Sequence, residues 1–240
     1  MKPEVSIVLP TYNEKKNLER LIPGLESMIK EERLKAEIIV VDDSSPDGTA
    51  DFARGLDRTY KNIHVIVRKK KQGIGPALVA GYNHAKGGII ASIDVDSFAP
   101  SDVAMLIRQV KKGSDLVVGS RYASNARYEK KRFKTYIKHF ISVNGNKLTK
   151  LLTGIDVNDF SLNCRAMTKA CWQAIAKYPK ETGSAMLLEM IWFAHKKGFK
   201  VTDFPVVFKD RQYGKSKMNL VKQPVMFFYT LLRMTLRRTR

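Results

Sequence analysis

Residues 89–96 read IIASIDVD, an apolar run that ends in two carboxylates separated by one residue. Such a run is typical of a strand buried on both faces of a parallel sheet. Its carboxyl end, where open α/β sheets bind ligands, would carry Asp94 and Asp96. Because alternate strand residues point to the same side, we expect the two carboxylates to share one partner. Hard oxygen ligands suit Mg²⁺ or Mn²⁺, although two acids at this spacing also occur where a strand simply ends in solvent.

Two earlier apolar runs also end in polar side chains. The runs occupy residues 5–9 and 38–41, and the side chains that follow are Tyr12, Glu14, Asp42 and Asp43. The carboxyl ends of parallel strands meet at one edge of a sheet, so these groups should converge with Asp94 and Asp96. An aromatic ring and carboxylates suit a nucleobase and its N–H donors, whereas the later pair suits a metal on a diphosphate. Each loop alone is more often ordinary turn chemistry.

Strand and helix patterns alternate through the first half of the chain. Further strands are predicted at residues 63–67 and 116–118, and helices at 18–29, 77–86 and 100–112. This alternation favours an α/β fold with a mostly parallel, doubly wound sheet that carries helices on both faces. Asn13 is expected to cap the first helix, and Pro23 is expected to kink or split it.

The second half of the chain is less regular. We expect a strand near Phe160, helices at 168–177 and 185–197, and a strand at 201–208. Residues 127–138 hold six basic residues and one acid, interleaved with aromatic side chains. Cys164 and Cys171 are seven residues apart, and we expect buried thiols on one helical face rather than a disulfide. Unpaired thiols indicate a reducing compartment.

The composition sets broad limits on function. A chain of 240 residues with 44% hydrophobic residues can build one sizeable domain and is not disordered. The 43 Lys and Arg against 23 Asp and Glu give a charge of +20, which attracts nucleic acid, an anionic membrane or phosphorylated substrates. The N-terminus does not resemble a signal peptide, and no run of 18 apolar residues would span a bilayer.

Four motifs occur in consistent order, namely Pro10-Thr11-Tyr12-Asn13-Glu14, Val41-Asp42-Asp43-x-Ser45-x-Asp47-Gly48-Thr49, Asp94-x-Asp96 and Gly119-Ser120-Arg121. Together they resemble the GT-A glycosyltransferases of family 2. Two later segments are similar to those of dolichol-phosphate mannose synthases and other polyprenyl-phosphate glycosyltransferases, namely Leu187-Leu188-Glu189 and Arg211-x-x-Gly214-x-Ser216-Lys217. The resemblance implies a Rossmann-like GT-A catalytic domain over residues 1–217.

The resemblance also implies the site residues. Those implied to bind a nucleotide sugar are Pro10, Tyr12, Glu14, Val41, Asp43, Gln72, Asp94, Val95 and Asp96. Asp94 and Asp96 are implied to hold Mg²⁺ or Mn²⁺ on the donor diphosphate, and both are implied to be catalytic together with Arg121 and Arg211. The acceptor phosphate is implied to meet Arg121, Ser161, Arg211 and Lys217.

Two positions depart from the family pattern. Phe98 stands where the family commonly has a Gln near the metal, and a phenyl ring cannot be a ligand. We therefore expect that Phe98→Gln would not weaken metal dependence. Residues 159–164 read DFSLNC, where the family has Asp-x-x-Ser-Gly-Phe on the acceptor side.

The function implied by the resemblance is inverting transfer of a hexose, such as mannose, to a polyprenyl or dolichyl phosphate. The donor would be a GDP- or UDP-hexose, whose diphosphate leaving group needs positive charge from a metal and basic side chains. A phosphate monoester, with a second pKa of about 6, is already nucleophilic at neutral pH. The chain lacks the Glu-Asp and Gln-x-x-Arg-Trp motifs of members that extend polysaccharides, which favours a single transfer to phosphate.

Two other functions remain open from the sequence. A GT-A enzyme could use a hydroxyl acceptor on a saccharide or protein, with Glu189 or Asp159 as the general base. A basic nucleic-acid-binding protein is supported only by the net charge, since no RNA-binding module motif is present. We therefore expect no nucleic-acid partner.

Residues 218–240 combine apolar and basic side chains. We expect an amphipathic helix, begun or kinked at Pro224, that lies on a membrane surface. It is too short to cross the roughly 30 Å hydrocarbon core, and the alternative is a helix packed on the protein. The expected location is peripheral, on the cytoplasmic face of a membrane. Truncation after Lys217 should then release the protein from anionic liposomes.

Overall fold

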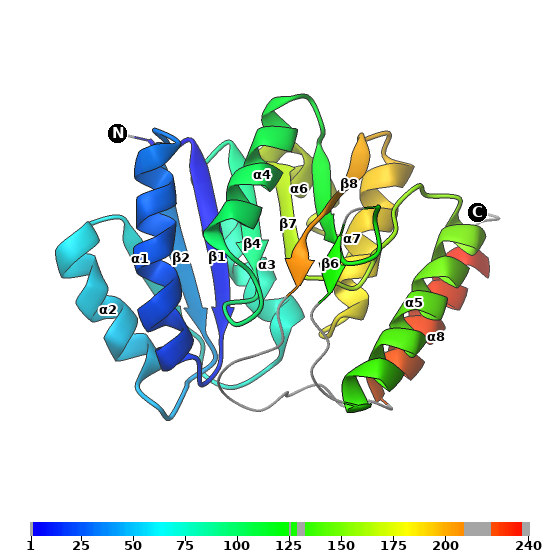
Figure 1. Ribbon diagram of the computed structural model, residues 1–240, viewed down its shortest axis with the longest axis horizontal. Coiled ribbons are helices and arrows are strands. Elements are labelled where there is room, and N and C mark those ends of the chain that lie inside the picture. Colours follow the sequence, from blue (N-terminus) through cyan, green and yellow to red (C-terminus); the bar gives the residue numbers. More distant parts are fainter. Residues whose placement is uncertain (1, 125, 129–132, 209–221, 237–240) are drawn as a thin grey trace.

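The computed structural model describes residues 2–124, 126–128, 133–208 and 222–236 (Figure 1). Its centre is a seven-stranded sheet in the order β3-β2-β1-β4-β7-β5-β8. These strands are β1 (Val5–Thr11), β2 (Ala36–Asp42), β3 (Ile63–Val67), β4 (Ile89–Ile93), β5 (Leu116–Ser120), β7 (Cys164–Thr168) and β8 (Val201–Pro205). β6 (Arg127–Tyr128) and β9 (Val207–Phe208) form a separate pair. Within the described residues, every strand pairing of the large sheet is parallel except those of β7, so the predicted α/β fold is confirmed.

Helices cover both faces of the sheet (Figure 1). They are α1 (Lys15–Glu31), α2 (Thr49–Tyr60), α3 (Ile74–His84), α4 (Pro100–Lys111), α5 (Phe133–Thr153), α6 (Lys169–Ile175), α7 (Ala185–Lys196) and α8 (Lys222–Leu236). Apolar residues of α1, α2 and α4 share one core, and those of α3, α6, α7 and α8 share the core on the opposite face. α5 and α8 lie side by side at one end of the molecule.

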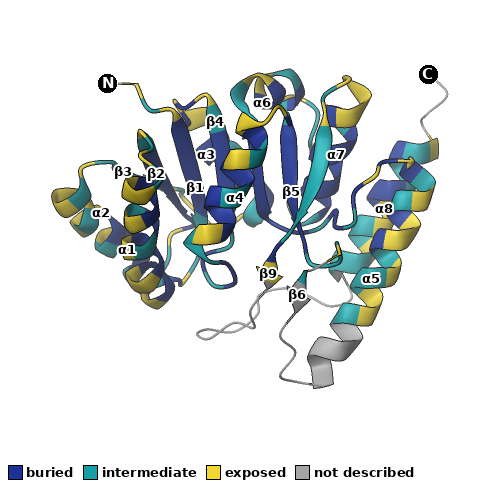
Figure 2. Cartoon of the chain, turned by 45° about the horizontal axis from the view of Figure 1, so that its top comes forward, coloured by how far each residue is buried: buried dark blue, intermediate teal, exposed yellow. Residues whose placement is uncertain are grey.

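The sheet separates these two cores, and Figure 2 shows its central strands as buried. Along β1, Ile7 and Leu9 belong to the core beneath α1 and α4, whereas Val8 belongs to the other core. All three side chains are fully buried. Coverage on both faces explains why the central strands read as continuous apolar runs instead of alternating ones.

The predicted convergence of strand ends is confirmed. β1 lies between β2 and β4 and runs parallel to both, so the carboxyl ends of all three strands meet at one edge. The pairing of β1 with β4 stops at Val8, while its pairing with β2 continues through Pro10. Pro10 therefore lies where β1 has one strand neighbour, a position in which a sheet tolerates proline.

Three expectations for the first half of the chain were wrong. β4 ends at Ile93, and Asp94 begins a turn closed by a 3.5 Å hydrogen bond from Ser97 N to its carbonyl, so strand alternation does not orient the two acids. Asn13 has a φ of 56°, and the N-cap position of α1 is occupied by Glu14. Pro23 lies inside α1 without splitting it, because the apolar side of this helix is anchored in the core.

The second half departs further from expectation. β7 begins at Cys164, so Phe160 lies in the preceding loop, where its apolar side chain is fully buried. β7 enters the sheet antiparallel between β4 and β5. Cys171 belongs to α6, so the two cysteines do not share a helical face. Both are buried and free, as predicted.

The C-terminal helix is present as α8, and Pro224 lies in its first turn. α8 packs against α7 and α5, and Leu231 and Met234 on it are buried. One side of the helix is therefore part of the core. No helix in the described part of the chain is long and apolar enough to cross a membrane.

Candidate active site

Asp94 and Asp96 lie half-buried in the turn that follows β4. Asn163 donates a hydrogen bond from Nδ2 to Asp94 Oδ1 at 2.9 Å, and Asp94 N donates to Asn163 O at 3.0 Å. Ser97 Oγ donates to Asp96 Oδ1 at 2.7 Å. Val95 between them is buried in the core, whereas the two acids are partly exposed.

Asn163 belongs to a buried polar chain that sequence reasoning missed. Ser92 Oγ donates to Asn163 Oδ1 at 2.9 Å and lies 2.6 Å from the hydroxyl oxygen of Tyr82. Burial raises the pKa of Tyr82 to about 12, so its hydroxyl remains protonated and can donate. The chain thus leads from α3 through β4 to the Asp94 carboxylate. The departure of residues 159–164 from the family pattern was the signal that could have identified Asn163.

Arg121 follows β5 and is held by a buried acid. Its Nε and Nη2 donate to the two oxygens of Asp159 at 2.7 and 3.0 Å, and the Asp159 side chain is fully buried. The same Nη2 lies 3.1 Å from Ser161 Oγ and 3.4 Å from Ser142 Oγ of α5. The structure therefore brings together Arg121 and Ser161, two of the residues implied for the acceptor phosphate.

One short loop connects these two groups. The loop covers residues 154–163 between α5 and β7, with Asp159 near its middle and Asn163 at its end. Because β7 lies between β4 and β5, Asp159 of this loop reaches Arg121 after β5, and Asn163 reaches Asp94 after β4. The Asp94 side and the Arg121 side of the candidate site are therefore held in place by the same loop.

Asp43, after β2, is engaged by a neighbouring loop. Arg68 Nη1 donates to its Oδ1 at 2.8 Å, and the backbone amides of Gln72 and Gly73 donate to its Oδ2 at 3.0 and 3.3 Å. The Arg68 side chain also donates to the Gln72 side chain. Gly73 has a φ of 96°, a backbone region that favours glycine. Arg68 was not predicted, although it directly follows β3 at the same sheet edge.

The remaining residues implied for the donor differ in what they expose. The ammonium nitrogen of Lys71 lies 4.0 Å from the centre of the half-buried Tyr12 ring. Glu14 is buried and accepts a 2.5 Å hydrogen bond from Asn17 Nδ2 in the first turn of α1. The side chain of Val41 is fully buried in the core, so this residue can offer a ligand only its backbone.

Phe98 packs into the core of the protein. Its side chain is 8% exposed and belongs to the core that α1 and α4 cover. The position therefore has a packing role, and the expectation that Phe98→Gln would not weaken metal dependence stays a prediction.

The two acids considered as general bases are both engaged. Asp159 is paired with Arg121, as described. Glu189 on α7 is 2% exposed and accepts hydrogen bonds from Lys180 N at 2.8 Å, Glu181 N at 2.9 Å and Arg233 Nη2 at 2.7 Å. Burial raises the pKa of Glu189. Both acids are therefore engaged in contacts that support the fold.

Arg211 and Lys217 lie outside the described residues, so their predicted contacts with phosphate remain predictions. The side chains of residues 127–138 lie outside them as well.

The family model described as Glycosyl transferase family 2 matches residues 6–173. A curated relative, the polyprenol monophosphomannose synthase of Mycolicibacterium smegmatis, is 30% identical over 219 residues, which cover 89% of this chain and 80% of the relative. The dolichol-phosphate mannosyltransferase of Pyrococcus furiosus is 34% identical over 218 residues, which cover 90% of this chain. The chain spans only 59% of the length of that second relative.

Solved structures share the fold at lower identity. A mannosyltransferase from Pyrobaculum calidifontis in complex with GDP-Man and Mn²⁺ has a TM-score of 0.65 at 17% identity, covering 100% of this chain and 66% of that one. A glucosyl-3-phosphoglycerate synthase from Mycobacterium tuberculosis in complex with Mn²⁺, UDP and phosphoglyceric acid has a TM-score of 0.70 at 18% identity, covering 97% and 78%. These likenesses confirm the GT-A fold.

Proposed function

The chain belongs to glycosyl transferase family 2, and on that premise we propose that it transfers mannose from GDP-mannose to a polyprenyl or dolichyl phosphate. The names of the two curated relatives support this choice, since one is a polyprenol monophosphomannose synthase and the other a dolichol-phosphate mannosyltransferase. The mannosyltransferase of similar fold was solved with GDP-Man, which supports the same donor.

The loop before β7 is the observation that carries the proposal. It holds Asp94 through Asn163 at 2.9 Å and Arg121 through Asp159 at 2.7 Å. A donor diphosphate bound at the Asp94 carboxylate and an acceptor phosphate bound at the Arg121 guanidinium would therefore lie close together, because the same loop holds both side chains. Proximity of this kind lowers the barrier, because the two reactants no longer lose orientational freedom in the transition state.

Asp94 and Asp96 would hold the divalent cation. Carboxylate oxygens are the ligands that Mg²⁺ and Mn²⁺ prefer, and the hydrogen bonds from Asn163 and Ser97 orient both groups. No group of three or more His, Cys, Asp or Glu residues in the described part of the chain could hold a metal. Two carboxylates together with substrate phosphate oxygens are a usual Mg²⁺ site. The ion would supply the positive charge that stabilises the leaving diphosphate.

A phosphate acceptor is consistent with Asp159 and Glu189 both being engaged in other contacts. A phosphate monoester, with a second pKa of about 6, carries an anionic oxygen at neutral pH and needs no general base. Its oxygen would form the new bond to the anomeric carbon while the bond to the diphosphate breaks, and GDP would leave with the electron pair. Arg121 would hold the acceptor phosphate beside Ser161, since planar guanidinium groups match phosphate oxygens. Arg211 and Lys217 would add charge from a segment outside the described residues.

A labelled-donor screen tests the proposal. The full chain is incubated with labelled GDP-mannose or UDP-glucose, polyprenyl phosphate and either Mg²⁺ or Mn²⁺, and label is measured in the lipid phase. We expect a mannosyl lipid from GDP-mannose, and its loss in Asp94→Ala and Asp96→Ala. Absence of a lipid-linked sugar from every common donor would contradict the proposal.

A further inference from the structure

One short chain segment lies between α8 and the start of α3. This segment, residues 180–184, precedes α7 and belongs to no strand or helix. It contacts α3 through Thr182 and α8 through Ser184. Gly73, the N-cap residue of α3, also donates a hydrogen bond to Asp43 of the candidate site. The segment therefore connects α8 with a direct partner of Asp43.

The contact between the segment and α3 is made by backbone atoms at close range. Gly75 N donates to Thr182 O at 3.0 Å, which satisfies one of the free amides in the first turn of α3. A Cβ atom on Gly75 would lie 2.8 Å from Glu181 O, and one on Gly73 would lie 2.9 Å from Thr182 O. The two glycines therefore let the segment pack directly against the backbone, and a shift of one moves the other.

The start of α3 in turn fixes the Asp43 carboxylate. Gln72 N and Gly73 N donate to Asp43 Oδ2 at 3.0 and 3.3 Å, and Arg68 Nη1 donates to Oδ1 at 2.8 Å. The Asp43 side chain is 5% exposed, so few other positions are open to it. Its orientation therefore depends on where the backbone of residues 72–73 lies.

Arg233 of α8 holds the first half of the segment. Its Nη1 lies 3.1 Å from Glu181 Oε1, and its Nη2 donates to Glu189 Oε1 at 2.7 Å. The other oxygen of Glu189 accepts hydrogen bonds from Lys180 N at 2.8 Å and Glu181 N at 2.9 Å. Arg233 thus contacts one side chain of the segment and fixes the buried carboxylate that holds the segment's backbone.

Gln223 of α8 holds the second half. Its Oε1 accepts hydrogen bonds from Ser184 Oγ at 3.0 Å and Ser184 N at 3.3 Å. A Cβ atom on Gly183 would lie 2.7 Å from the same oxygen, so this contact is also close. Gln223 and Arg233 are about three helical turns apart. α8 therefore holds the segment at both of its ends.

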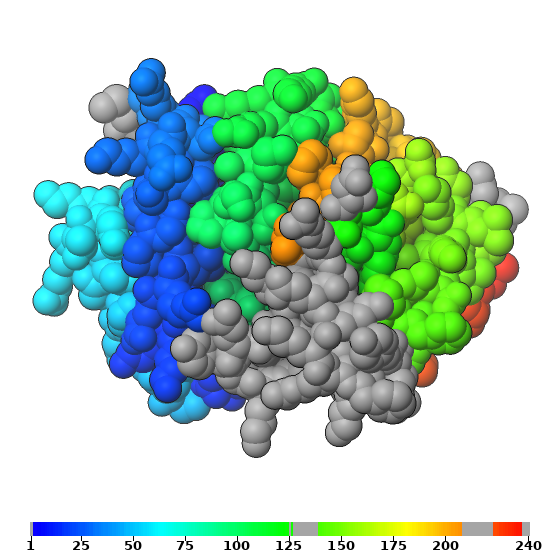
Figure 3. All heavy atoms as spheres, in the orientation of Figure 1, coloured from blue at the N-terminus to red at the C-terminus, as the bar shows by residue number. Residues whose placement is uncertain are grey.

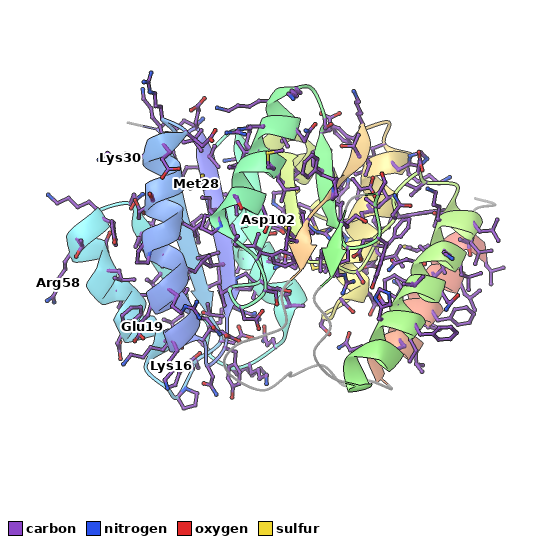
Figure 4. All side chains as sticks on the ribbon, viewed as in Figure 1. Lys16, Glu19, Met28, Lys30, Arg58 and Asp102 are labelled. Atoms are coloured by element: carbon purple, nitrogen blue, oxygen red, sulfur yellow. The ribbon has the colours of Figure 1, made fainter. Side chains whose placement is uncertain are left out.

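Arg233 differs from the charged residues on the outer helices. Lys30 on α1 and Arg58 on α2 are exposed and extend away from the ribbon (Figure 4). The Arg233 side chain is only 25% exposed, and its partner Glu189 is 2% exposed. Exposed ion pairs contribute little, whereas pairs with a buried member are screened less by solvent. The Arg233 contact is therefore suited to hold a segment in place.

We propose that α8 positions the Asp43 carboxylate for nucleotide-sugar binding, with Arg233 and Gln223 as the positioning residues. α8 lies at the margin of the molecule opposite α2 (Figure 3), and the Asp43 contacts given above come from Arg68, Gln72 and Gly73. The effect of α8 therefore passes through residues 180–184 and then through the start of α3. The inference rests on the proposed function, since that function gives Asp43 a nucleotide sugar to bind.

The first test is amide hydrogen exchange of the full chain, followed by NMR without nucleotide or lipid. The variants are Arg233→Gln and Gln223→Ala, each of which removes contacts from α8 to the segment. The matched control is Arg108→Gln, because Arg108 of α4 also pairs with a carboxylate, that of Glu32 at the end of α1. The amides of β5 report whether the whole protein has become less stable.

We expect the amides of Gln72, Gly73 and Gly75 to exchange about 3- to 10-fold faster in both α8 variants, as loss of about one hydrogen bond predicts. The amides of β5 should exchange as in wild type, and the control should change neither group. Unchanged exchange at the start of α3 would overturn the proposal. Equal acceleration at the start of α3 and in β5 would also overturn it, because it would show only a general loss of stability.

The second test is binding of GDP-mannose in the presence of Mn²⁺, measured by calorimetry. The Kd should rise about 3- to 10-fold in Arg233→Gln and Gln223→Ala, since Asp43 is held less firmly. The transfer rate at saturating donor and the KM for polyprenyl phosphate should stay within about twofold of wild type. Unchanged donor affinity, or equal losses of donor and acceptor affinity, would contradict a positioning role toward the donor.

A third variant tests the same contact without changing α8. In Gly75→Ala the new methyl group would displace the Glu181 carbonyl, so we expect the same selective loss of donor affinity. The matched control is Gly55→Ala in α2, where nothing lies within 4 Å of the added Cβ atom. If Arg233→Gln does not fold, this variant and Gln223→Ala still decide the matter. Wild-type donor affinity in Gly75→Ala would overturn the proposal.

The two proposals fail separately. If the wild type binds no nucleotide sugar, the proposed function is refuted, and hydrogen exchange still decides whether α8 holds the start of α3. If the wild type transfers mannose but the variants keep wild-type donor affinity, only the positioning role of α8 is refuted.

Discussion

Asn163 donates a 2.9 Å hydrogen bond from Nδ2 to Oδ1 of Asp94, although 69 residues separate the two in sequence. Asn163 is 2% exposed, and its own oxygen accepts from Ser92. The side chain is therefore fixed from both ends and sets the orientation of the carboxylate. A group that orients a metal ligand typically changes metal affinity or activity when it is removed.

Replacing Asn163 with Ala should weaken the metal dependence. We expect activation by Mn²⁺ to require about 10- to 100-fold more metal, because the Asp94 carboxylate loses the bond that orients it. The measurement is transfer rate against Mn²⁺ concentration. The matched control is Asn62→Ala, whose Nδ2 donates to Ala36 O at the opposite edge of the sheet. If Asn163→Ala had the same metal requirement as wild type, Asn163 would not position Asp94 for a metal.

Arg121→Lys keeps the charge but loses the forked contact to Asp159 and to phosphate. We expect kcat/KM for polyprenyl phosphate to fall by about 10- to 100-fold, as one charge-assisted hydrogen bond is worth about 1.5–3 kcal/mol. The affinity for GDP-mannose should change less than about twofold, because the donor binds elsewhere in the proposed site.

The control for this variant is Arg108→Lys. Arg108 also makes a forked pair, with Glu32, but it is 52% exposed and lies on α4. An equal loss of donor and acceptor affinity in Arg121→Lys would indicate general damage to the site. Unchanged acceptor kinetics would remove Arg121 from the acceptor side.

Phe98→Gln should destabilise the protein. The ring is 8% exposed in the core, so the substitution removes apolar burial and introduces an amide there. We expect a loss of about 2–4 kcal/mol in the free energy of unfolding, measured by urea denaturation. Phe98→Leu, which stays apolar, should cost less. Wild-type stability of Phe98→Gln combined with tighter Mn²⁺ activation would show that position 98 faces the metal.

Cys164 and Cys171 should be unreactive in the folded protein. Burial raises the pKa of the Cys171 thiol to about 12 and that of Cys164 well above its usual range. At pH 8 the reactive thiolate is therefore nearly absent, and reagent cannot reach either sulfur. Iodoacetamide at pH 8 should leave both residues unlabelled, whereas the chain unfolded in guanidinium should label at both. Rapid labelling of the folded chain would show that one thiol is accessible.

The location of the site at the carboxyl edge of the sheet was predictable, because strands buried on both faces appear in the sequence as continuous apolar runs. Continuous apolar runs identified β1, β2 and β4, and parallel strands necessarily bring their carboxyl ends together. This was enough to bring Asp43 and Asp94 to one region of the molecule. The exact end of β4 was not predictable, because Val95 continues the apolar pattern into the turn.

The residues that hold the site's carboxylates in place could not be predicted from the sequence. Asn163 meets Asp94 because β7 enters the sheet antiparallel beside β4, and no local pattern specifies that placement. Arg68 lies in a basic stretch that resembles a solvated loop, yet it pairs with Asp43 at 2.8 Å. Comparison with the family motif gives the position of Phe98 in the sequence. It does not show that the side chain packs into the core after the turn at Asp94.

The exposed apolar residues on the outer sides of α5 and α8 could not be predicted, for a similar reason. Helical spacing in sequence shows apolar sides but not which of them are covered. Only the packing of α8 against α5 and α7 shows that Leu231 faces inward while Phe228 faces outward.

The central claim is that the acceptor group is a phosphate on a polyprenyl chain. The most direct measurement offers labelled GDP-mannose and Mn²⁺ to the full chain with vesicles that contain either polyprenyl phosphate or the matching polyprenol. We predict labelled mannosyl lipid with the phosphate and none with the alcohol, because the two acids considered as general bases, Asp159 and Glu189, are engaged by Arg121 and Arg233. Transfer to the free polyprenol, or to neither lipid, would contradict the account.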